Sequence, residues 1–364
     1  MRARQAGPTS RTGKTLLSVS GVLVVLLFYV SMAQAQASVW QVFLERGDNT
    51  DTLSFVSLTG EPTTQIEIAR GERHTVMDQG LLYWSNGEAL YATPEETEPH
   101  PFIQVDGAQR VEWVLSPDGA QIAWTQTTTN AGQLTTVTRA AAIDGSDARI
   151  VFQDGPRPGV RAQPVAFGAT NDVLYMDYQP DGLAAATPYS EYAGLFAVPL
   201  GGDGPPELLP DEPGCYCGAG FGNGRFLRLT VSEGAGAFGL TLQDLFSGTS
   251  STIEPLPLGA FTQGGDVLLS PDGTRAVYAL AQSRDFGTPA QTVRSVYVRV
   301  DLDTRTQEQI TVPQTLYLRP VTWTENSSAV LMTSPVRPGT WKLDVQTGRL
   351  DLVAEATYIG RIGG

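Results

Sequence analysis

One short segment occurs twice in this chain and constrains the fold more than any other feature. Residues 114–125 and 268–279 each contain apolar residues, then Ser-Pro-Asp-Gly, two variable residues, and a run that ends beside an aromatic residue. Proline presets the backbone at the second turn position, and glycine supplies the positive φ that lets the next strand leave. The segment therefore predicts strand, tight turn and strand, and its recurrence predicts an internal structural repeat.

Weaker copies of the same junction fill the rest of the chain. The first junction recurs at 167–175, 221–226 and 323–331, and a second junction occurs at 142–150, 300–308 and 343–350. Each unit thus contains four short strands. The two Ser-Pro-Asp-Gly turns are separated by three periods of about 51 residues, near the long end of propeller repeats. Six units begin near His74, Arg110, Arg161, Tyr216, Phe261 and Tyr317.

A seventh unit is assembled from both ends of the chain. Residues 39–44, 52–58 and 64–68 supply three strands with no first strand, and residues 358–362 form a strand with no unit of its own. If the C-terminal strand completes the N-terminal blade, no long sheet edge stays unpaired. We predict an all-β fold, a seven-bladed β-propeller of four-stranded antiparallel blades formed by a single domain, 38–364. Six or eight blades are the alternatives, because the unit at His74 is short.

The repeated motif resembles the WD-like repeats of TolB-type propellers. The likeness spans residues 38–362, and the complete motif stands in the units that begin at Arg110 and Phe261. The Gly-His and Trp-Asp pairs of true WD repeats are absent, as is the N-terminal α/β domain of TolB itself. The resemblance therefore implies the propeller fold, and TolB's own role does not carry over.

The first 37 residues predict an export signal. All four of their charges are basic, an apolar stretch follows at 16–32, and small residues end it at Ala33-Gln-Ala35 and Ala35-Gln-Ala37. This order is typical of a signal peptide cleaved after Ala35 or Ala37, so we expect a secreted or periplasmic protein. The alternative is an uncleaved membrane anchor at 16–32 with the propeller outside, although this stretch is short for a span.

Charge narrows the range of partners. The chain carries 24 basic and 38 acidic residues, a formal net charge of −14, and loss of the signal leaves −18. A protein that binds phosphates needs many basic residues on one face. We therefore expect no nucleic-acid partner, and membrane contact only through an uncleaved N-terminus. A protein or peptide partner is favoured, a glycan is the other option, and the chain is expected to be monomeric.

Motifs for catalysis are missing from the sequence. There is no Gly-x-Ser-x-Gly, so a prolyl-oligopeptidase-like hydrolase is not expected. His74 and His100 are the two histidines, and neither has other ligand residues close in sequence. We expect both to face solvent, with no metal, no cofactor and no assigned catalytic residue. Cys215 and Cys217 are one residue apart and can form a small disulfide or stay as two thiols, since so short a loop is stabilised little by closure.

Long insertions are expected on one face of the propeller. Turns between first and second strands and between third and fourth strands are short, whereas the other two classes, which emerge on the opposite face, hold insertions at 126–132, 155–163, 179–192, 211–220 and 282–292. We call this the long-loop face. Loops on a rigid scaffold are where binding residues gather. The candidate partner-binding residues there are Arg157, Arg161, Tyr189, Tyr192, Tyr216, Arg284, Asp285 and Phe286, which combine aromatic surface with polar groups.

These observations favour a non-enzymatic scaffold that binds a protein, peptide or glycan through the long-loop face around the central channel. One alternative is a hydrolase or lyase that acts on an extracellular sugar or lactone with carboxylates at the channel mouth. Another is a structural module whose loops only cover the blade edges. Two or three acidic or histidine side chains meeting at the channel would favour the enzyme.

Overall fold

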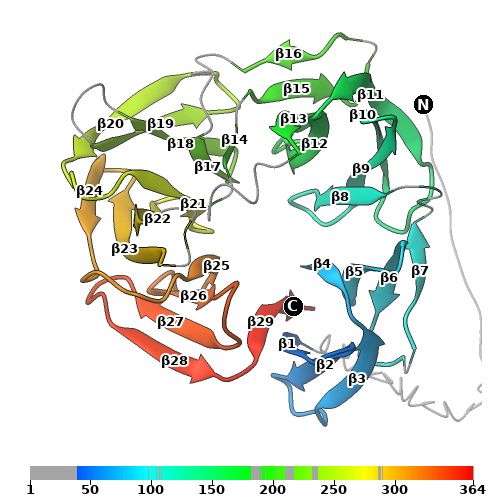
Figure 1. Ribbon diagram of the computed structural model, residues 1–364, viewed down its shortest axis with the longest axis horizontal. Coiled ribbons are helices and arrows are strands. Elements are labelled where there is room, and N and C mark those ends of the chain that lie inside the picture. Colours follow the sequence, from blue (N-terminus) through cyan, green and yellow to red (C-terminus); the bar gives the residue numbers. More distant parts are fainter. Residues whose placement is uncertain are drawn as a thin grey trace, which may run out of the picture. The chain divides into compact units, whose positions relative to one another are not determined.

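The described part of the chain is a ring of β-sheets (Figure 1). The computed structural model describes residues 39–96, 98–103, 105, 107, 109–181, 189, 191–192, 194–202, 204–209, 217–231, 237–285, 288 and 290–363, with the backbone alone at 217 and 231. Every helix or strand assigned in these residues is a strand, β1 to β29. The all-β prediction is confirmed.

Seven antiparallel blades form the ring, and each has its strands in the order first to fourth. Blades 1 to 3 are β29 (Thr357–Ile362), β1 (Trp40–Arg46), β2 (Thr50–Ser57) and β3 (Thr64–Ala69); β4 (Glu72–Val76), β5 (Leu81–Ser85), β6 (Glu88–Ala92) and β7 (His100–Ile103); β8 (Arg110–Leu115), β9 (Gln121–Asn130), β10 (Gln133–Ala142) and β11 (Arg149–Pro158). Blades 4 and 5 are β12 (Val160–Phe167), β13 (Val173–Pro180), β15 (Phe196–Pro199) and β16 (Glu207–Leu208); β17 (Cys217–Gly222), β18 (Arg225–Val231), β19 (Phe238–Asp244) and β20 (Ser250–Leu256), with β14 (Glu191–Tyr192) added beside β17. Blades 6 and 7 are β21 (Gln263–Leu269), β22 (Arg275–Arg284), β23 (Thr292–Asp301) and β24 (Thr306–Gln309); β25 (Arg319–Trp323), β26 (Ala329–Thr333), β27 (Thr340–Asp344) and β28 (Leu350–Ala354).

The ring closes as predicted, through the C-terminal strand. β29 is the first strand of blade 1 and pairs antiparallel with β1, with Trp40 opposite Ile362 and Phe43 opposite Tyr358. The rings of Phe43 and Tyr358 meet edge to face, 5.6 Å between centroids. One edge strand of blade 1, β29, therefore comes from the C-terminal end of the domain, and the other, β3, comes from the N-terminal end. The count of seven blades is confirmed.

The Ser-Pro-Asp-Gly turn owes its shape to side-chain hydrogen bonds. The Ser116 hydroxyl donates to Asp118 Oδ1 at 2.6 Å and accepts from the Gln121 backbone N–H at 2.8 Å. Gly119 donates its N–H to the Ser116 carbonyl and has a φ of 68°, which a side chain disfavours. The Asp118 carboxylate also accepts from the Ala120 N–H at 3.0 Å. The motif therefore closes a tight turn in the way its residues predict.

The hydrophobic core lies between blades. Six clusters of buried apolar side chains are found in the described residues, and each is built from two neighbouring blades. Tyr278 of β22, for example, is fully buried against side chains of blade 5. Blade-to-blade packing therefore fixes where each first strand presents its side chains at the channel.

Two predicted insertions are regular structure. Residues 126–132 form the tip of the extended β9–β10 hairpin, in which Asn130 lies opposite Gln133. Residues 155–163 belong mostly to β11 and β12, separated by one residue, Gly159. The prediction of loops at 126–132 and 155–163 was wrong, because β9, β10 and β11 are each ten residues long and continue into these segments.

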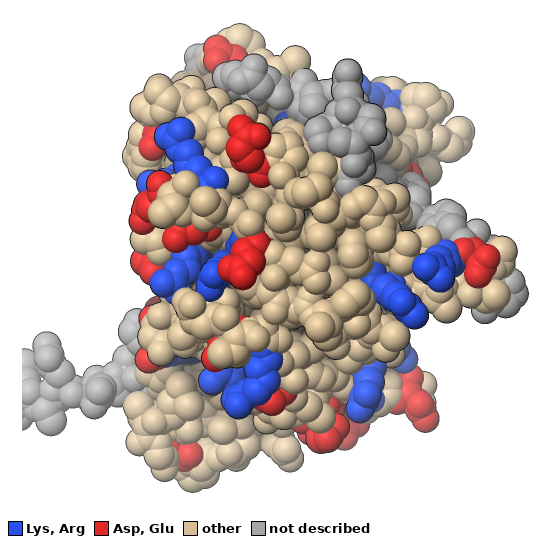
Figure 2. Space-filling view, turned by 90° about the vertical axis from the view of Figure 1, so that its left-hand side faces the viewer, with Lys and Arg blue, Asp and Glu red and all other residues tan. Residues whose placement is uncertain are grey.

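The long-loop face follows from strand direction. In four antiparallel strands, the connections from second to third strand and from blade to blade leave on the same side. The first residues of β4, β8, β12, β21 and β25 therefore lie at this face. On the side of the molecule drawn in Figure 2, basic and acidic side chains are interspersed among broad uncharged areas.

The predicted signal, its cleavage sites at Ala35 and Ala37 and the alternative anchor at 16–32 lie outside the described residues. Within the described part, no helix is long and apolar enough to cross a membrane.

Candidate binding site at the long-loop face

Two of the predicted binding residues flank the turn between blades 3 and 4. Arg157, near the end of β11, forms an ion pair with Asp154 at 2.8 Å, and its guanidinium lies 4.5 Å from the centre of the Tyr178 ring. Arg161, on β12, is 8% exposed and forms an ion pair with Glu112 of blade 3. Arg157 is thus part of the surface, whereas Arg161 belongs to a buried group of charged residues.

The predicted aromatic surface is partly wrong. Tyr189 is 3% exposed, and its ring meets that of Tyr317 edge to face at 5.3 Å. A Cβ atom at Gly265 would overlap with the Tyr189 side chain, so this tyrosine fills a space that glycine leaves. Tyr192 lies on β14, opposite Cys217, and burial raises its pKa to about 12. Tyr189 therefore belongs to the core of blades 6 and 7 instead of an exposed surface.

The other predicted binding residues are either exposed or outside the described residues. Arg284 ends β22 and is exposed, and Asp285 follows it with a φ of 54°. Tyr216, Phe286 and Cys215 lie outside the described residues, and only the backbone of Cys217 is described. The disulfide stays a prediction.

A group of charged residues, of which only Arg161 was predicted, lies at the starts of three consecutive first strands. Glu112 of β8 is 4% exposed, and its Oε1 accepts from Arg161 Nη1 at 2.8 Å and from Arg73 Nη2 at 2.7 Å. Arg73 lies on β4 with a φ of 56°, at a β-bulge. One buried carboxylate therefore joins blades 2, 3 and 4.

A second carboxylate completes this group. Asp181, directly after β13, pairs with Arg110 of β8 at 2.8 Å and lies 3.7 Å from Arg161 Nε. Its backbone N–H donates to the Gly159 carbonyl, which places it beside the start of β12. We call Arg73, Arg110, Glu112, Arg161 and Asp181 the arginine cluster.

Positive charge dominates the arginine cluster. Burial lowers the pKa of the Arg161 guanidinium, the nearby Arg110 and Arg73 lower it further, and Glu112 and Asp181 oppose the change. Three guanidinium groups share two carboxylates, so one positive charge is left uncompensated. The cluster can therefore accept an additional anionic group, with the half-exposed Arg73 and Arg110 side chains as its donors.

A second polar group lies across blades 6 and 7. Asp266 of β21 has a φ of 52° at a β-bulge, accepts a hydrogen bond from the Tyr317 hydroxyl, and lies 3.6 Å from Arg319 Nε. Burial and the Asp266 carboxylate raise the pKa of Tyr317, so its phenol stays protonated. These contacts join β25 and the residues before it to β21.

The histidines differ from each other. His100 is exposed, as expected, and lies 3.1 Å from Glu96. His74 stacks on Tyr83 at 5.7 Å, and its Nε2 is buried with no hydrogen-bond partner. The prediction that it faces solvent was therefore wrong. No group of three or more His, Cys, Asp or Glu residues that could hold a metal ion occurs in the described residues.

The cluster could have been found from the repeat. Arg110 and Arg319 are the first residues of β8 and β25, and Arg161 is the second residue of β12, so an arginine stands near the beginning of the first strand in three units. Because first strands surround the channel, a charge at this repeated position predicts a charged mouth.

The closed ring of seven antiparallel blades defines this chain as a seven-bladed β-propeller. No protein-family model and no curated protein matches it. Among solved structures, an oligogalacturonate lyase in complex with manganese is similar, with 11% identity, a TM-score of 0.57, and coverage of 88% of this chain and 90% of that chain.

Two further solved structures share the fold. An oligogalacturonate lyase from Vibrio parahaemolyticus is 9% identical over 82% of this chain and 95% of its own, with a TM-score of 0.51. A prolyl endopeptidase is 11% identical over 89% of this chain but only 50% of its own, also with a TM-score of 0.51. At such identities the likeness extends to the fold alone.

Proposed function

We propose that this protein is an exported, non-enzymatic propeller that binds an acidic segment of a protein or peptide at the arginine cluster. The observation that carries the proposal is the convergence of three arginines from three blades on two carboxylates within the described part of the chain. Buried Glu112 holds Arg161 in place, while Arg73 and Arg110 keep 37% and 42% of their side chains exposed. The planar guanidinium forks can then bind a partner's carboxylates in pairs of hydrogen bonds.

An acidic glycan is the other form of the same ligand chemistry. The similar lyases are named for oligogalacturonate, a sugar chain that carries a carboxylate on each unit. A uronate chain and an acidic peptide both carry carboxylates along the chain, so either can bind to the arginine cluster. The binding experiment therefore includes both ligands.

The test is binding of a glutamate-rich peptide and of oligogalacturonate to the purified full chain, with a glutamine-rich peptide and a neutral oligosaccharide as matched ligands. In the double variant Arg73→Gln/Arg110→Gln we expect binding about tenfold weaker or more. Arg294→Gln is the control, because Arg294 is exposed on β23, outside the cluster. Unchanged binding by the double variant, or equal binding of charged and neutral ligands, would refute the proposal.

A second candidate is a hydrolase or lyase acting on a sugar. It is favoured by one observation, that Glu112 and Asp181 both contact Arg161 and so meet at one guanidinium. Glycosidases use two carboxylates about 5–9 Å apart. Breakdown of oligogalacturonate that is lost in Glu112→Gln and kept in Arg294→Gln would select the enzyme. Binding without breakdown would select the scaffold.

A further inference from the structure

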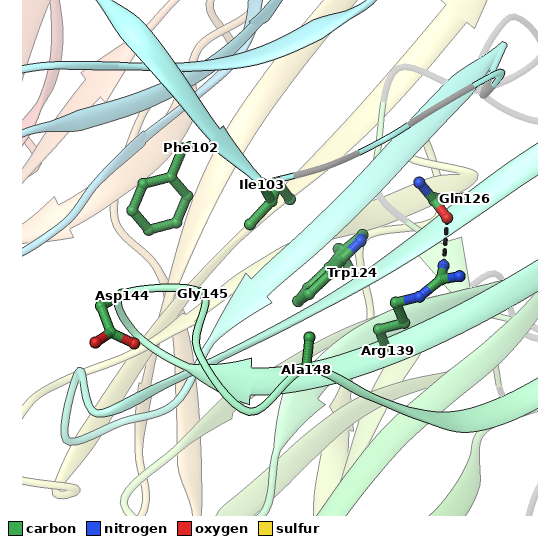
Figure 3. Close-up of a pocket in the computed structure, with 8 residues that line it drawn as sticks. All are labelled: Phe102, Ile103, Trp124, Gln126, Arg139, Asp144, Gly145 and Ala148. Atoms are coloured by element: carbon green, nitrogen blue, oxygen red, sulfur yellow. Dashed lines mark hydrogen bonds between the residues drawn. The ribbon is translucent and has the colours of Figure 1, made fainter.

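A pocket between blades 2 and 3 contains none of the residues of the arginine cluster (Figure 3). Its volume is about 340 Å³, and its lining includes Phe102 and Ile103 of β7, Trp124 and Gln126 of β9, Arg139 of β10, and Asp144. Ligand pockets begin at about 300 Å³. The pocket is therefore large enough for a small molecule.

Polar donors gather at one end of this pocket. Trp124 and Gln126 alternate on β9 and so share a face, and Arg139 lies directly opposite Trp124 in the β9–β10 register. Arg139 Nη1 donates to Gln126 Oε1. Figure 3 shows the indole nitrogen, the amide and the guanidinium at the same end, away from Phe102 and Asp144.

Two of these donors lack the partners expected of them. Trp124 is 3% exposed, and its Nε1–H is buried without a hydrogen-bond partner among the residues that the structure describes, which is rare in folded proteins. Arg139 forms no ion pair with any described residue, although the chain carries an excess of acidic residues. A single carboxylate that displaces the Gln126 amide at this end would serve both groups.

The other end of the pocket limits the ligand. Asp144 is the only carboxylate among the lining residues, and its Oδ1 already accepts from the Ser146 N–H at 2.9 Å and hydroxyl at 2.6 Å. Phe102, on the same side as Asp144, and Ile103, between the two ends, supply an apolar wall. A ligand with a second negative charge would meet Asp144, whereas an apolar body would lie against β7.

We propose that this pocket binds a small monocarboxylic acid with an apolar body. The carboxylate replaces Gln126 as the acceptor for Arg139 and also accepts the Trp124 indole N–H, while the body packs on Phe102 and Ile103. The guanidinium fork and the indole are both donors only, so a carboxylate suits them and a cation does not.

The test uses phenylacetate and its neutral match phenylacetamide with the full chain. Calorimetry measures affinity, and the indole ¹H–¹⁵N resonance of Trp124, assigned through Trp124→Phe, reports the new hydrogen bond. We expect phenylacetate to shift that resonance downfield and to bind about tenfold more tightly than phenylacetamide. Arg139→Gln should lose this preference, while Arg294→Gln, a change at an exposed third-strand arginine of blade 6, should keep it.

Three results would overturn the proposal. The first is equal affinity for the acid and the amide, and the second is an Arg139→Gln variant that binds phenylacetate like the wild type. The third is a Trp124 resonance that stays unmoved by phenylacetate, benzoate and isovalerate at millimolar concentration. The melting temperature of each variant, measured without ligand, separates loss of binding from loss of folding.

Discussion

Arg161 and Glu112 form a buried ion pair between blades 4 and 3, with 2.8 Å between Nη1 and Oε1. The two residues are 8% and 4% exposed, so neither can exchange its partner for water without opening the blade interface. A buried charge is tolerated when it is paired and costs several kcal/mol when it is not. The same contact therefore supports both the ring and the proposed binding site.

The first prediction concerns the loss of this partner. In Glu112→Leu the Arg161 guanidinium stays buried with the neutral Gln163 as its hydrogen-bond acceptor and with Asp181 3.7 Å from its Nε, so we expect a loss of about 3 kcal/mol in the free energy of unfolding. Urea denaturation at neutral pH measures it. The double variant Glu112→Leu/Arg161→Met removes both charges and should be more stable than Glu112→Leu alone. Losses that simply add would show that the two residues are not coupled.

The second prediction is a pH dependence from His74. Burial, together with the nearby Arg46, lowers the pKa of His74 from 6.5 to about 4. The unfolded chain then takes up a proton more readily than the folded one. Above pH 6.5 His74 is neutral in both states and does not lower the free energy of unfolding. As pH falls from 6.5 towards 4, His74 lowers the free energy of unfolding by up to about 1.4 kcal/mol per pH unit.

His74→Phe tests this dependence because it keeps a ring stacked on Tyr83 and removes the titrating group. Unfolding free energies measured from pH 7 to pH 4 should fall less steeply in this variant than in the wild type. Parallel curves for His74→Phe and the wild type would contradict the assignment.

The fold was predictable because its signals are local. Ser116, Asp118 and Gly119 specify one turn within a few residues, and their repetition gives the strand order and the closing strand. The site was harder, because Arg73, Glu112 and Arg161 come from three units and meet only when blades pack.

The rest of the site could not be predicted from the sequence because the strands that carry it are irregular. β-bulges at Arg73 and Asp266 break the alternation that tells inward from outward residues, and both have positive φ. The sequence places Tyr189 at the surface because it stands in the long insertion at 179–192 of the long-loop face. Its burial depends on the space left by Gly265 on a different blade, which no nearby residue signals.

The third prediction tests the repeated turn in blade 6. The Ser270 hydroxyl donates to Asp272 at 2.5 Å, accepts from the Arg275 N–H at 2.9 Å, and is the main cause that lowers the pKa of Asp272 to about 2. Ser270→Ala should cost about 1–2 kcal/mol in unfolding free energy. Ser270→Thr should cost little, because Thr324 makes the two corresponding bonds in blade 7, donating to Asn326 Oδ1 and accepting from the Ala329 N–H. Equal losses in the two variants would contradict this account.

The same turn gives a separate acid transition. Because the folded pKa of Asp272 is depressed below its ordinary 3.8, the stabilisation is present above pH 3.8 and is lost as pH falls towards 2. Ser270→Ala should raise the Asp272 pKa, measured by carboxyl NMR titration. This window lies below that of His74, so the two effects can be resolved in one pH series. A pKa of about 2 retained in Ser270→Ala would assign the shift to backbone donors instead.

The fourth prediction concerns ring closure at Gly360. This residue lies opposite Val42 on the closing strand, and a Cβ atom there would overlap with the Val76 side chain of blade 2. Gly360→Ala should therefore lower the unfolding free energy by about 1–3 kcal/mol through overpacking. Adding Val76→Ala makes room and should restore most of the loss, whereas Gly201→Ala, with no atom within 4 Å of its Cβ position, should be neutral. A Gly360→Ala variant as stable as Gly201→Ala would show that blades 1 and 2 can separate enough to admit a methyl group.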